Sequence, residues 1–383
     1  MRDRNNFSDI CLVGHPYAPI GMGEHVRATH RALSSVGIAP RILDIYGLNH
    51  PAEEEEREFS VAMGDRTPGH INIFHINGDE VEQSLQHISY HAPWTGYNII
   101  YPAWELSRYP KEWAIQLDRF DEIWAPSKFV GDAIRLVSKP QVIDMPLACE
   151  VRLTKFLSRR YFGLPESYCI FLNFFDIRSY VDRKNPFAVL EAFRRLVADR
   201  PFNKLALVLK VNGAEQAPEL FEEMQRKIAD IRGRVIVIGR VMSDNEIKNL
   251  IRCCDCFVSL HRSEGYGRGM AEAMYLGKPV IATGYSGNMD FMNGDVAYLV
   301  GYDLIEVKSG QYPFFQGQFW ADPNISQATE LMGFISENPN EAKGMGQRGQ
   351  RHIKTGFSFL AIGLRYRERI DEIRINRAAR VEL

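Results

Sequence analysis

Short apolar runs of strand length alternate with helical patterns along most of this chain, and that alternation constrains the fold more than any other feature. Strand-like runs are found at residues 10–13, 41–45, 71–74, 98–101, 122–125, 169–173, 206–211, 235–238, 256–260 and 280–282. Helical patterns are found at 22–36, 127–137, 185–199, 217–231, 244–253 and 267–276. Such alternation is typical of parallel sheets joined by right-handed crossovers. It predicts an α/β protein made of doubly wound, Rossmann-like units.

The chain has 383 residues, which is longer than a single core usually grows, so two domains are expected. We place the boundary at residue 152, where a polar and basic stretch at 152–160 precedes the next strand-like run. The predicted domains are residues 1–152 and 153–358. Ligands of open α/β sheets bind beyond the carboxyl ends of the strands, so a cleft between the two domains is expected.

The last segment, residues 359–383, has the pattern of an amphipathic helix. Ile362, Tyr366, Ile370 and Ile373 recur at spacings of four, four and three. From residue 351 to 383 there are eight Lys or Arg and four Asp or Glu. The helix therefore either docks on the body of the protein or suits an anionic membrane surface.

Composition excludes several classes of protein. A net charge of −2 argues against bulk nucleic-acid binding. No apolar stretch approaches the roughly 18 residues of a membrane-spanning helix, and the N-terminus does not have the pattern of a signal peptide, so a cytoplasmic location is expected. The cluster Cys253-Cys-Asp-Cys256 lacks the paired spacing of a zinc site, and its apolar neighbours predict core packing. No metal site is predicted.

Two glutamates, Glu264 and Glu272, are the strongest sign of a ligand site. Glu264 lies in a glycine-rich turn after a strand-like run, and Glu272 lies about two turns into the helix that follows. Glycines at 265, 267 and 269 allow close approach of the backbone to a ligand, and the N–H groups at a helix start favour an anion. Carboxylates accept hydrogen bonds from vicinal hydroxyls, so a sugar nucleotide is a plausible ligand. An acidic residue near a helix start, with a solvated second glutamate, is the alternative.

The flanking sequence adds a resemblance to a known family. After the helix the chain reads Gly277-Lys-Pro-Val-Ile-Ala282, and upstream it reads Asp182-Arg-Lys-Asn-Pro186. Together with the two glutamates, which have seven residues between them, these segments resemble the retaining glycosyltransferases of family four, strongly over residues 170–295 and more loosely over the first 150. The resemblance implies the GT-B fold, a nucleoside-diphosphate sugar as donor, no required metal or other cofactor, and retention of the anomeric configuration. It also implies that 1–152 is the acceptor side, joined by helix 359–383, and that 153–358 binds the donor.

Roles for the second domain follow from the same resemblance. Lys184 and Arg178, six residues apart, would neutralise the diphosphate, with Arg183 as a substitute for Arg178. Glu264 and the backbone of Gly265, Tyr266 and Gly267 would hold the donor sugar, and Glu272 would fix the ribose. Backbone contacts to the base and ribose are expected around Asn212 and Val241, which follow strand-like runs.

Candidates in the first domain are less distinctive. Gly21 and Gly23 follow the first strand and would supply backbone donors, although the full dinucleotide fingerprint is absent because position 26 is Val. The histidine that the family places on the donor sugar has two candidates here, His75 at a strand end and His91. Trp104 and Glu105 would form an acceptor shelf, since sugar faces stack on aromatic rings, unless Trp104 belongs to the core.

The predicted function is transfer of a hexose from a nucleoside-diphosphate sugar to a glycan or lipid-linked acceptor in polysaccharide biosynthesis. UDP-glucose is the favoured donor and GDP-mannose the next. A sugar-nucleotide epimerase on the same fold and a non-catalytic sugar-nucleotide-binding protein are the alternatives. The expected location is the cytoplasm, with the inner face of the membrane left open by the basic C-terminal segment.

Overall fold

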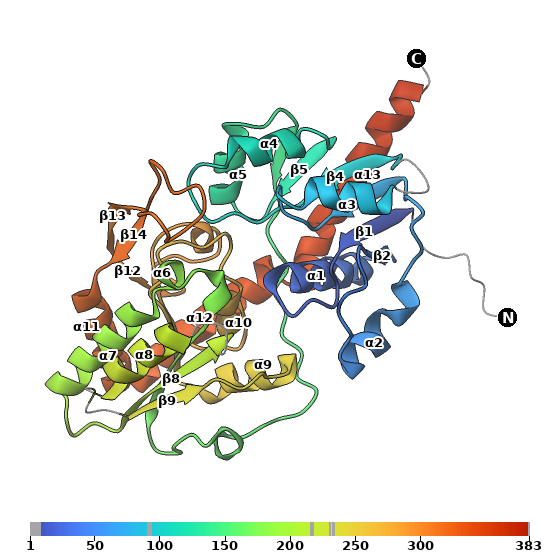
Figure 1. The fold of residues 1–383 in the computed structure, drawn as a ribbon. Coiled ribbons are helices and arrows are strands. Elements are labelled where there is room, and N and C mark those ends of the chain that lie inside the picture. The colour runs from blue at the N-terminus through green and yellow to red at the C-terminus, as the bar shows by residue number, and fades with distance from the viewer. Residues whose placement is uncertain (1–8, 90–93, 215–217, 230, 232–233, 382–383) are drawn as a thin grey trace. The chain divides into compact units, whose positions relative to one another are not determined.

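The computed structural model describes residues 9–89, 94–214, 218–229, 231 and 234–381, which form two compact units (Figure 1). Unit 1 comprises Met1–Cys149 and Thr355–Leu383, and unit 2 comprises Glu150–Lys354. Each unit contains a parallel sheet of six strands in its described part, with helices between successive strands. The prediction of two doubly wound α/β units is confirmed.

The sheet of unit 1 has the strand order β2-β1-β3-β4-β5-β6, and all its neighbours pair in parallel. Central strand β1 is buried along its whole length, and its Val13 pairs with Leu43 on one side and Phe74 on the other. The strands are β1 (Ile10–Gly14), β2 (Arg41–Asp44), β3 (Ile71–Phe74), β4 (Tyr97–Ile100), β5 (Glu122–Ala125) and β6 (Gln141–Asp144). The helices are α1 (Gly21–Ser35), α2 (Glu53–Phe59), α3 (Val81–Ile88), α4 (Lys111–Leu117), α5 (Lys128–Arg135) and α13 (Phe359–Val381).

Helix α13 returns from the end of the chain to pack on unit 1. Its predicted apolar stripe is confirmed, because Ile362, Tyr366, Ile370 and Ile373 are all at most 2% exposed. Contact with α1 is close, since a Cβ on Gly363 would lie 2.2 Å from the carbonyl oxygen of Ala32. The helix is therefore part of the core of this unit.

The sheet of unit 2 has the order β12-β11-β10-β7-β8-β9, so the chain reverses its direction of travel across the sheet between β7 and β10. The strands are β7 (Cys169–Asp176), β8 (Leu205–Asn212), β9 (Arg234–Ile238), β10 (Cys256–Ser259), β11 (Val280–Thr283) and β12 (Tyr298–Val300). The helices are α6 (Val181–Lys184), α7 (Pro186–Asp199), α8 (Pro218–Ala229), α9 (Asp244–Cys253), α10 (Arg268–Tyr275), α11 (Ile325–Glu337) and α12 (Pro339–Gly356). In open sheets of this kind, the point of reversal is where ligands bind.

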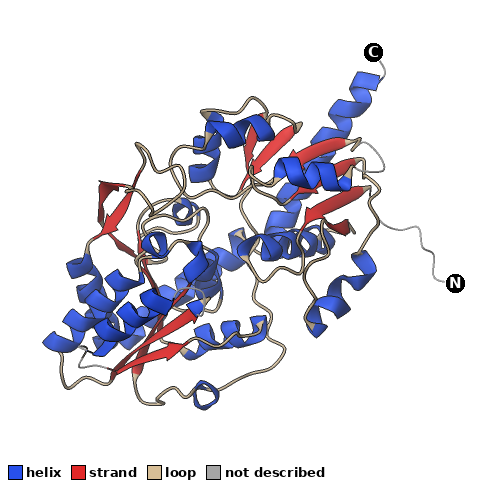
Figure 2. Cartoon of the chain, viewed as in Figure 1, coloured by secondary structure: helices blue, strands red, loops and turns tan. Residues whose placement is uncertain are grey.

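Unit 2 also carries an antiparallel hairpin that the strand pattern did not predict. Strands β13 (Tyr302–Glu306) and β14 (Phe319–Pro323) form a separate two-stranded sheet, drawn in red beside the helices in Figure 2. Trp320 of β14 is fully buried, and the guanidinium of Arg262 lies 5.5 Å from the centre of the Trp320 ring. The hairpin is thus anchored to the loop that follows β10.

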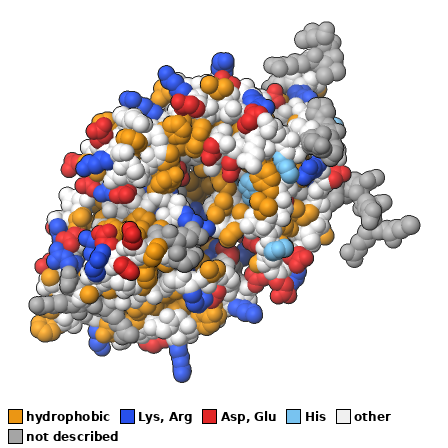
Figure 3. Space-filling view, in the orientation of Figure 1, with side chains coloured by type: hydrophobic (Ala, Val, Ile, Leu, Met, Phe, Trp, Pro, Cys, Tyr) orange, Lys and Arg blue, Asp and Glu red, His pale blue; other side chains and the backbone are white. Residues whose placement is uncertain are grey.

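Two further observations concern the surface and the cysteines. On the face shown in Figure 3, Lys and Arg side chains are interspersed with Asp and Glu rather than gathered in one patch. None of the helices formed by the described residues is long and apolar enough to cross a membrane. Cys253, Cys254 and Cys256 are free thiols and buried, as the prediction of core packing requires.

The attachment of α13 to unit 1 can be tested through one buried ion pair. Arg369 donates to both carboxylate oxygens of Glu122, at 3.0 and 2.5 Å, and Glu122 is fully buried. Replacing Arg369 by Met leaves a buried carboxylate without its counter-charge, so we expect the free energy of unfolding to fall by about 3 kcal/mol. Urea denaturation followed by tryptophan fluorescence measures this, because Trp124 donates to the same carboxylate.

The matched control is Arg374→Met on the same helix. Arg374 pairs with Asp9 and Asp371, and its side chain is 40% exposed. Its loss should change stability by less than about 1 kcal/mol, because exposed ion pairs contribute little. Equal effects of the two substitutions would show that the Arg369 pair does not hold the helix in place.

Candidate functional site

Three loops of unit 2 meet at the carboxyl edge of its sheet, where the strand order reverses. The loop after β7 leads into α6 and α7, the loop after β10 leads into α10, and the loop after β11 contains residues 284–290. Because β7, β10 and β11 are neighbours and run parallel, their carboxyl ends lie at one edge. The fold therefore brings together segments that lie about 80 and 20 residues apart in the sequence.

At the centre of this edge, two cations hold the carboxylate of Glu264. The ammonium of Lys184 lies 2.6 Å from Oε1, and Nη1 of Arg183 lies 3.1 Å from Oε2. Glu264 and Arg183 are 8% and 4% exposed, whereas the side chain of Lys184 is 24% exposed. The loop after β7 and the loop after β10 are thus joined by a buried ion cluster with one cation at its open side.

The cluster is ionised and carries a net positive charge. Burial by itself raises the pKa of Glu264, but Lys184, Arg183 and His261 outweigh that effect and lower the pKa to about 2. One negative charge between Lys184 and Arg183 leaves an excess of one positive charge. A site of this charge, open on the lysine side, suits an anionic ligand such as a phosphate group.

Backbone contacts fix the position of Glu264. The N–H of Glu264 donates to Oγ of Ser286 at 2.8 Å, and its carbonyl accepts from the N–H of Gly287 at 2.9 Å. A Cβ on Gly287 would lie 2.1 Å from the carbonyl oxygen of Gly265, so only glycine fits there. The loop after β11 therefore holds the loop after β10 in place.

Non-glycine residues with left-handed backbone gather around the cluster. Ser286 has φ +75°, Asn185 has φ +51° and Tyr180 has φ +58°. Such conformations cost free energy and persist where the surroundings impose them, often at functional sites. Asn185 ends α6 in this conformation, and its side chain donates to the carbonyl of Leu260 at 3.0 Å. This turn directs Arg183 and Lys184 toward Glu264.

Helix α10 begins beside Glu264, as the glycine-rich turn predicted. Gly267 caps it with φ +98°, and Tyr266 is 5% exposed with its ring 4.9 Å from that of Phe291. Glu272 lies in the second turn of the helix and is 8% exposed. One segment, the turn and the first two turns of α10, therefore carries both glutamates and the residues Gly265 to Gly267.

Arg178, which the sequence assigned together with Lys184 to the diphosphate, is paired with Asp176. It lies in a short 3-10 helix at Ile177–Ser179, where its guanidinium donates to Asp176 at 2.9 and 2.6 Å. Its side chain is 47% exposed. Arg183, the substitute considered from the sequence, is the residue that shares Glu264 with Lys184.

The two positions expected near the base and ribose also follow strands at this edge. Asn212 ends β8, and its side-chain oxygen accepts from the buried ammonium of Lys210. Val241 lies between β9 and α9 and is 89% exposed. Neither geometry tests the predicted backbone contacts.

In unit 1, the two glycines at the start of α1 differ in their surroundings. A Cβ on Gly23 would lie 2.1 Å from the carbonyl oxygen of Ala18, so packing requires glycine there. Gly21 is exposed, and a Cβ on it would meet no heavy atom within 4 Å. Packing therefore accounts for a glycine at position 23 but not at position 21.

His75 lies directly after β3 in a buried aromatic group. It is fully buried, with ring centroids 4.6 Å from His25 and 5.6 Å from Tyr101. Neither of its ring nitrogens has a hydrogen-bond partner among the described residues. Burial lowers the pKa of His75 to about 3, so it is neutral at ordinary pH. The rival candidate, His91, lies outside the described residues.

Trp104 belongs to the core, which is the alternative that the sequence left open beside an acceptor shelf. Trp104 is 1% exposed, its Nε1 donates to the carbonyl of Arg108 at 2.9 Å, and it packs against the rings of Tyr109 and Trp113. A ring enclosed in this way offers no face to a sugar. Glu105 beside it is only partly buried.

Sequence reasoning missed residues that support the cluster without carrying its charge. Ser286 accepts from Glu264, and Asn288 holds His261 through a 3.1 Å contact between Oδ1 and Nε2. The backbone N–H of Arg262 donates to the carbonyl of Arg183 at 2.8 Å. A serine and a glycine shortly after the buried strand β11, at Ser286 and Gly287, were the available signal for a tight turn.

The low pKa of His75 has a consequence for stability. The unfolded chain binds a proton near pH 6.5 and the folded protein only near pH 3, so acidification favours unfolding across this window. Between pH 7 and pH 5, we expect wild type to lose about 2 kcal/mol more stability than His75→Phe. Denaturant titrations at both pH values measure it, with His70→Phe as the control because the side chain of His70 is 86% exposed. An equal loss in wild type and His75→Phe would contradict a neutral His75.

Comparison with known proteins finds a family that the second unit matches. Residues 173–352, just under half of the chain, match the family described as glycosyl transferases group 1. Trehalose synthase of Pyrococcus horikoshii is 25% identical over 45% of this chain and 37% of its own length. Alpha-1,3/1,6-mannosyltransferase ALG2 of Dictyostelium discoideum is 24% identical over 38% of this chain and 30% of its own. The chain therefore matches about a third of the length of these curated relatives.

Solved structures match over nearly the whole chain. HepE of Anabaena, in complex with UDP-glucose, has a TM-score of 0.67 at 13% identity and covers 95% of this chain and 99% of its own. Sucrose-phosphate synthase of Thermosynechococcus elongatus has a TM-score of 0.65 at 16% identity and covers 96% and 99%. At such identities the likeness shows the fold alone. Residues 173–352 thus match the family of glycosyl transferases group 1, in a chain that has the GT-B fold.

Proposed function

We propose that this protein is a retaining glycosyltransferase that moves a hexose from a nucleoside-diphosphate sugar to a glycan or lipid-linked acceptor in polysaccharide biosynthesis. The observation that carries the proposal is the cluster of Glu264, Lys184 and Arg183 at the carboxyl edge of the sheet. The family match over the same segment supports it. In this proposal the cluster binds the reacting part of the donor.

The donor fits the cluster through charge and hydroxyl groups. Lys184 and Arg183 neutralise the diphosphate, and the N–H groups at the start of α10 add donors of hydrogen bonds. Glu264, ionised because its pKa is about 2, accepts from hydroxyls of the hexose. Glu272 accepts from the ribose. Protein cations then stabilise the leaving diphosphate without a metal ion.

The proposed reaction exchanges one bond to the anomeric carbon for another. The bond from this carbon to the diphosphate oxygen breaks as the bond to the acceptor oxygen forms on the same face of the sugar. The departing phosphate oxygen takes the acceptor's proton, so retention requires no protein nucleophile. Lys184 and Arg183 would stabilise the charge that grows on the diphosphate in the transition state.

UDP-glucose is the proposed donor and GDP-mannose the next candidate. The structural relative HepE is described in complex with UDP-glucose, and ALG2 is named as a mannosyltransferase. We propose the cytoplasm, with the inner face of the membrane open to the basic helix α13, as the place of the reaction.

Loss of the Glu264 charge tests the central role. Glu264→Gln keeps the shape of the side chain but removes its negative charge and one of its two acceptor oxygens, so turnover should fall roughly a hundredfold or more. The assay incubates radiolabelled UDP-glucose and GDP-mannose with acceptor extracts and follows label that leaves the nucleotide. Glu191→Gln is the control, because Glu191 pairs only with Arg194 and Arg195 among the ion pairs of α7.

Unchanged turnover in folded Glu264→Gln would refute the role of this carboxylate. The same assay separates the competing functions by their products. An altered sugar still attached to the nucleotide identifies an epimerase, and binding without any product identifies a silent binding protein. Transfer of label to an acceptor with the original anomeric configuration is the expected result.

The proposal that Lys184 rather than Arg178 supplies the main charge on the diphosphate has a separate test. Lys184→Met removes the cation at the open side of the cluster, so the Kd for the free nucleoside diphosphate should rise at least about tenfold. Arg178→Met removes a half-exposed cation already paired with Asp176, and the Kd should rise less than about threefold. Calorimetric titration with UDP and GDP measures both. A larger effect at Arg178 would restore the assignment made from the sequence.

A further inference from the structure

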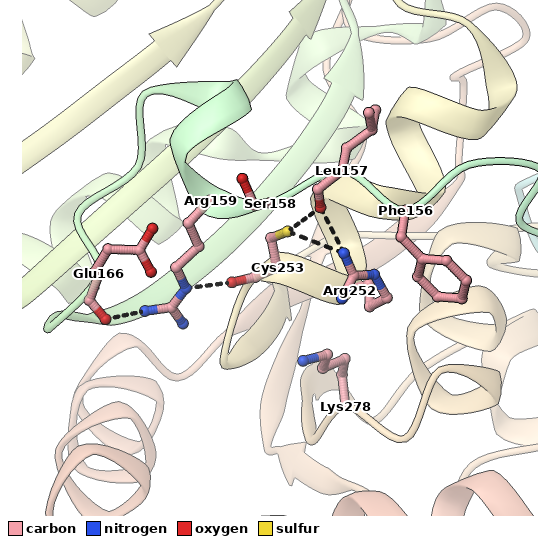
Figure 4. A pocket seen from close by; sticks show the side chains of 8 residues that line it. All are labelled: Phe156, Leu157, Ser158, Arg159, Glu166, Arg252, Cys253 and Lys278. Carbon is pink, nitrogen blue, oxygen red and sulfur yellow. Dashed lines mark hydrogen bonds between the residues drawn. The ribbon is translucent and has the colours of Figure 1, made fainter.

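Unit 2 has a pocket at the edge of its sheet opposite to Glu264, shown in Figure 4. The pocket has a volume of about 410 Å³ and includes Phe156, Arg159, Arg252, Cys253 and Lys278 in its wall. Cys253 ends α9 just before β10, and Lys278 comes just before β11. The pocket therefore lies at the amino ends of parallel strands, whereas Glu264 and Lys184 follow their carboxyl ends.

Lys278 is the least satisfied charged group of this pocket. Its ammonium makes no hydrogen bond or ion pair with any residue in the described part of the chain. Burial lowers the pKa of Lys278, and only more distant charges, Asp255 foremost, oppose that effect. In Figure 4 the side chain stands apart from the hydrogen-bonded residues on the other side of the pocket. An ammonium in this position lacks a nearby anion.

Arg252 supplies a second cation with donors to spare. Its Nε donates to Asn249 at 3.2 Å and its Nη2 to the carbonyl of Leu157 at 2.5 Å, while the ring of Phe156 lies 5.3 Å from the guanidinium. Nη1 has no partner within the described residues, and no carboxylate pairs with this arginine there. The guanidinium is held in one orientation with an edge left to bind a ligand.

The remaining charges do not neutralise this pair. Arg159 is saturated, because it donates to Asp255 at 2.8 Å and to the carbonyls of Cys253, Glu166 and Tyr168. Arg159 and Asp255 cancel, which leaves Arg252 and Lys278 against the exposed side chain of Glu166. The pocket has an excess of positive charge in a protein whose net charge is −2.

We propose that this pocket binds a phosphate group between Lys278 and Arg252, as inorganic phosphate or as the monoester of a small metabolite. A tetrahedral dianion presents oxygens to both cations at once, and charge-assisted hydrogen bonds of this kind are strong. The volume exceeds that of a phosphate ion, and the exposed ring of Phe156 provides a wall for the rest of a monoester. The site is separate from the proposed donor site and does not depend on the proposed function.

Calorimetric titration of the full chain with inorganic phosphate, and in parallel with a hexose phosphate, tests the site. Lys278→Met should raise the Kd for phosphate at least about tenfold, because it removes one of two charged donors. The same variant should fold at least as stably as wild type without phosphate, since it removes a buried and unpaired charge. Whichever of the two ligands has the lower Kd for wild type shows whether the pocket takes inorganic phosphate or a phosphate monoester.

Two controls separate this site from the rest of the protein. Lys227→Met makes the same change on exposed helix α8 and should leave the Kd unchanged. Lys184→Met removes one of the two cations of the donor site and should leave the Kd for phosphate at the Lys278 pocket unchanged. Wild-type binding by folded Lys278→Met, or loss of binding only in Lys184→Met, would overturn the proposal. Either result would leave the proposed transferase function untouched.

Discussion

The ion cluster of Glu264 with Lys184 and Arg183 is the interaction on which the organisation of unit 2 depends. A carboxylate this deeply buried is stable as an anion only because two cations contact it. The cations come from the loop after β7 and the anion from the loop after β10, on either side of the point where the strand order reverses. The cluster therefore joins the two halves of the sheet and sets the charge of the edge where a ligand would bind.

The backbone around the cluster adopts conformations that cost free energy. Tyr180, Asn185 and Ser286 adopt left-handed conformations, and Gly287 approaches Gly265 so closely that no side chain fits. Contacts of Asn185, Ser286 and Gly287 fix the three loops relative to one another. A phosphate or a sugar would meet donors and acceptors already in place, which is the condition under which electrostatic stabilisation is most effective.

The two edges of the unit 2 sheet differ in how their charges are satisfied. At the carboxyl edge, Lys184 and Arg183 share a carboxylate. At the amino edge, Lys278 and Arg252 face a pocket without a paired carboxylate in the described structure. In unit 1, His75 is buried with no hydrogen-bond partner for its ring nitrogens among the described residues, and burial lowers its pKa, so it is neutral. A buried ionisable side chain is thus paired with an opposite charge, faces a pocket that can bind an anion, or is neutral, and its neighbours decide which.

The sequence by itself determined the repeated strand and helix pattern, the buried stripe of α13 and the glycine-rich start of α10, because these follow from local periodicity and turn chemistry. Only the tertiary structure decided that Arg183 rather than Arg178 contacts Glu264, that Trp104 is enclosed by Tyr109 and Trp113, and that β13 and β14 form a hairpin. The contact of Arg183 with Glu264 joins residues 81 positions apart, and the other two outcomes depend on how nearby turns direct a side chain or a strand. Spacing in a sequence does not specify where a side chain points when a residue such as Asn185 turns the backbone left-handed.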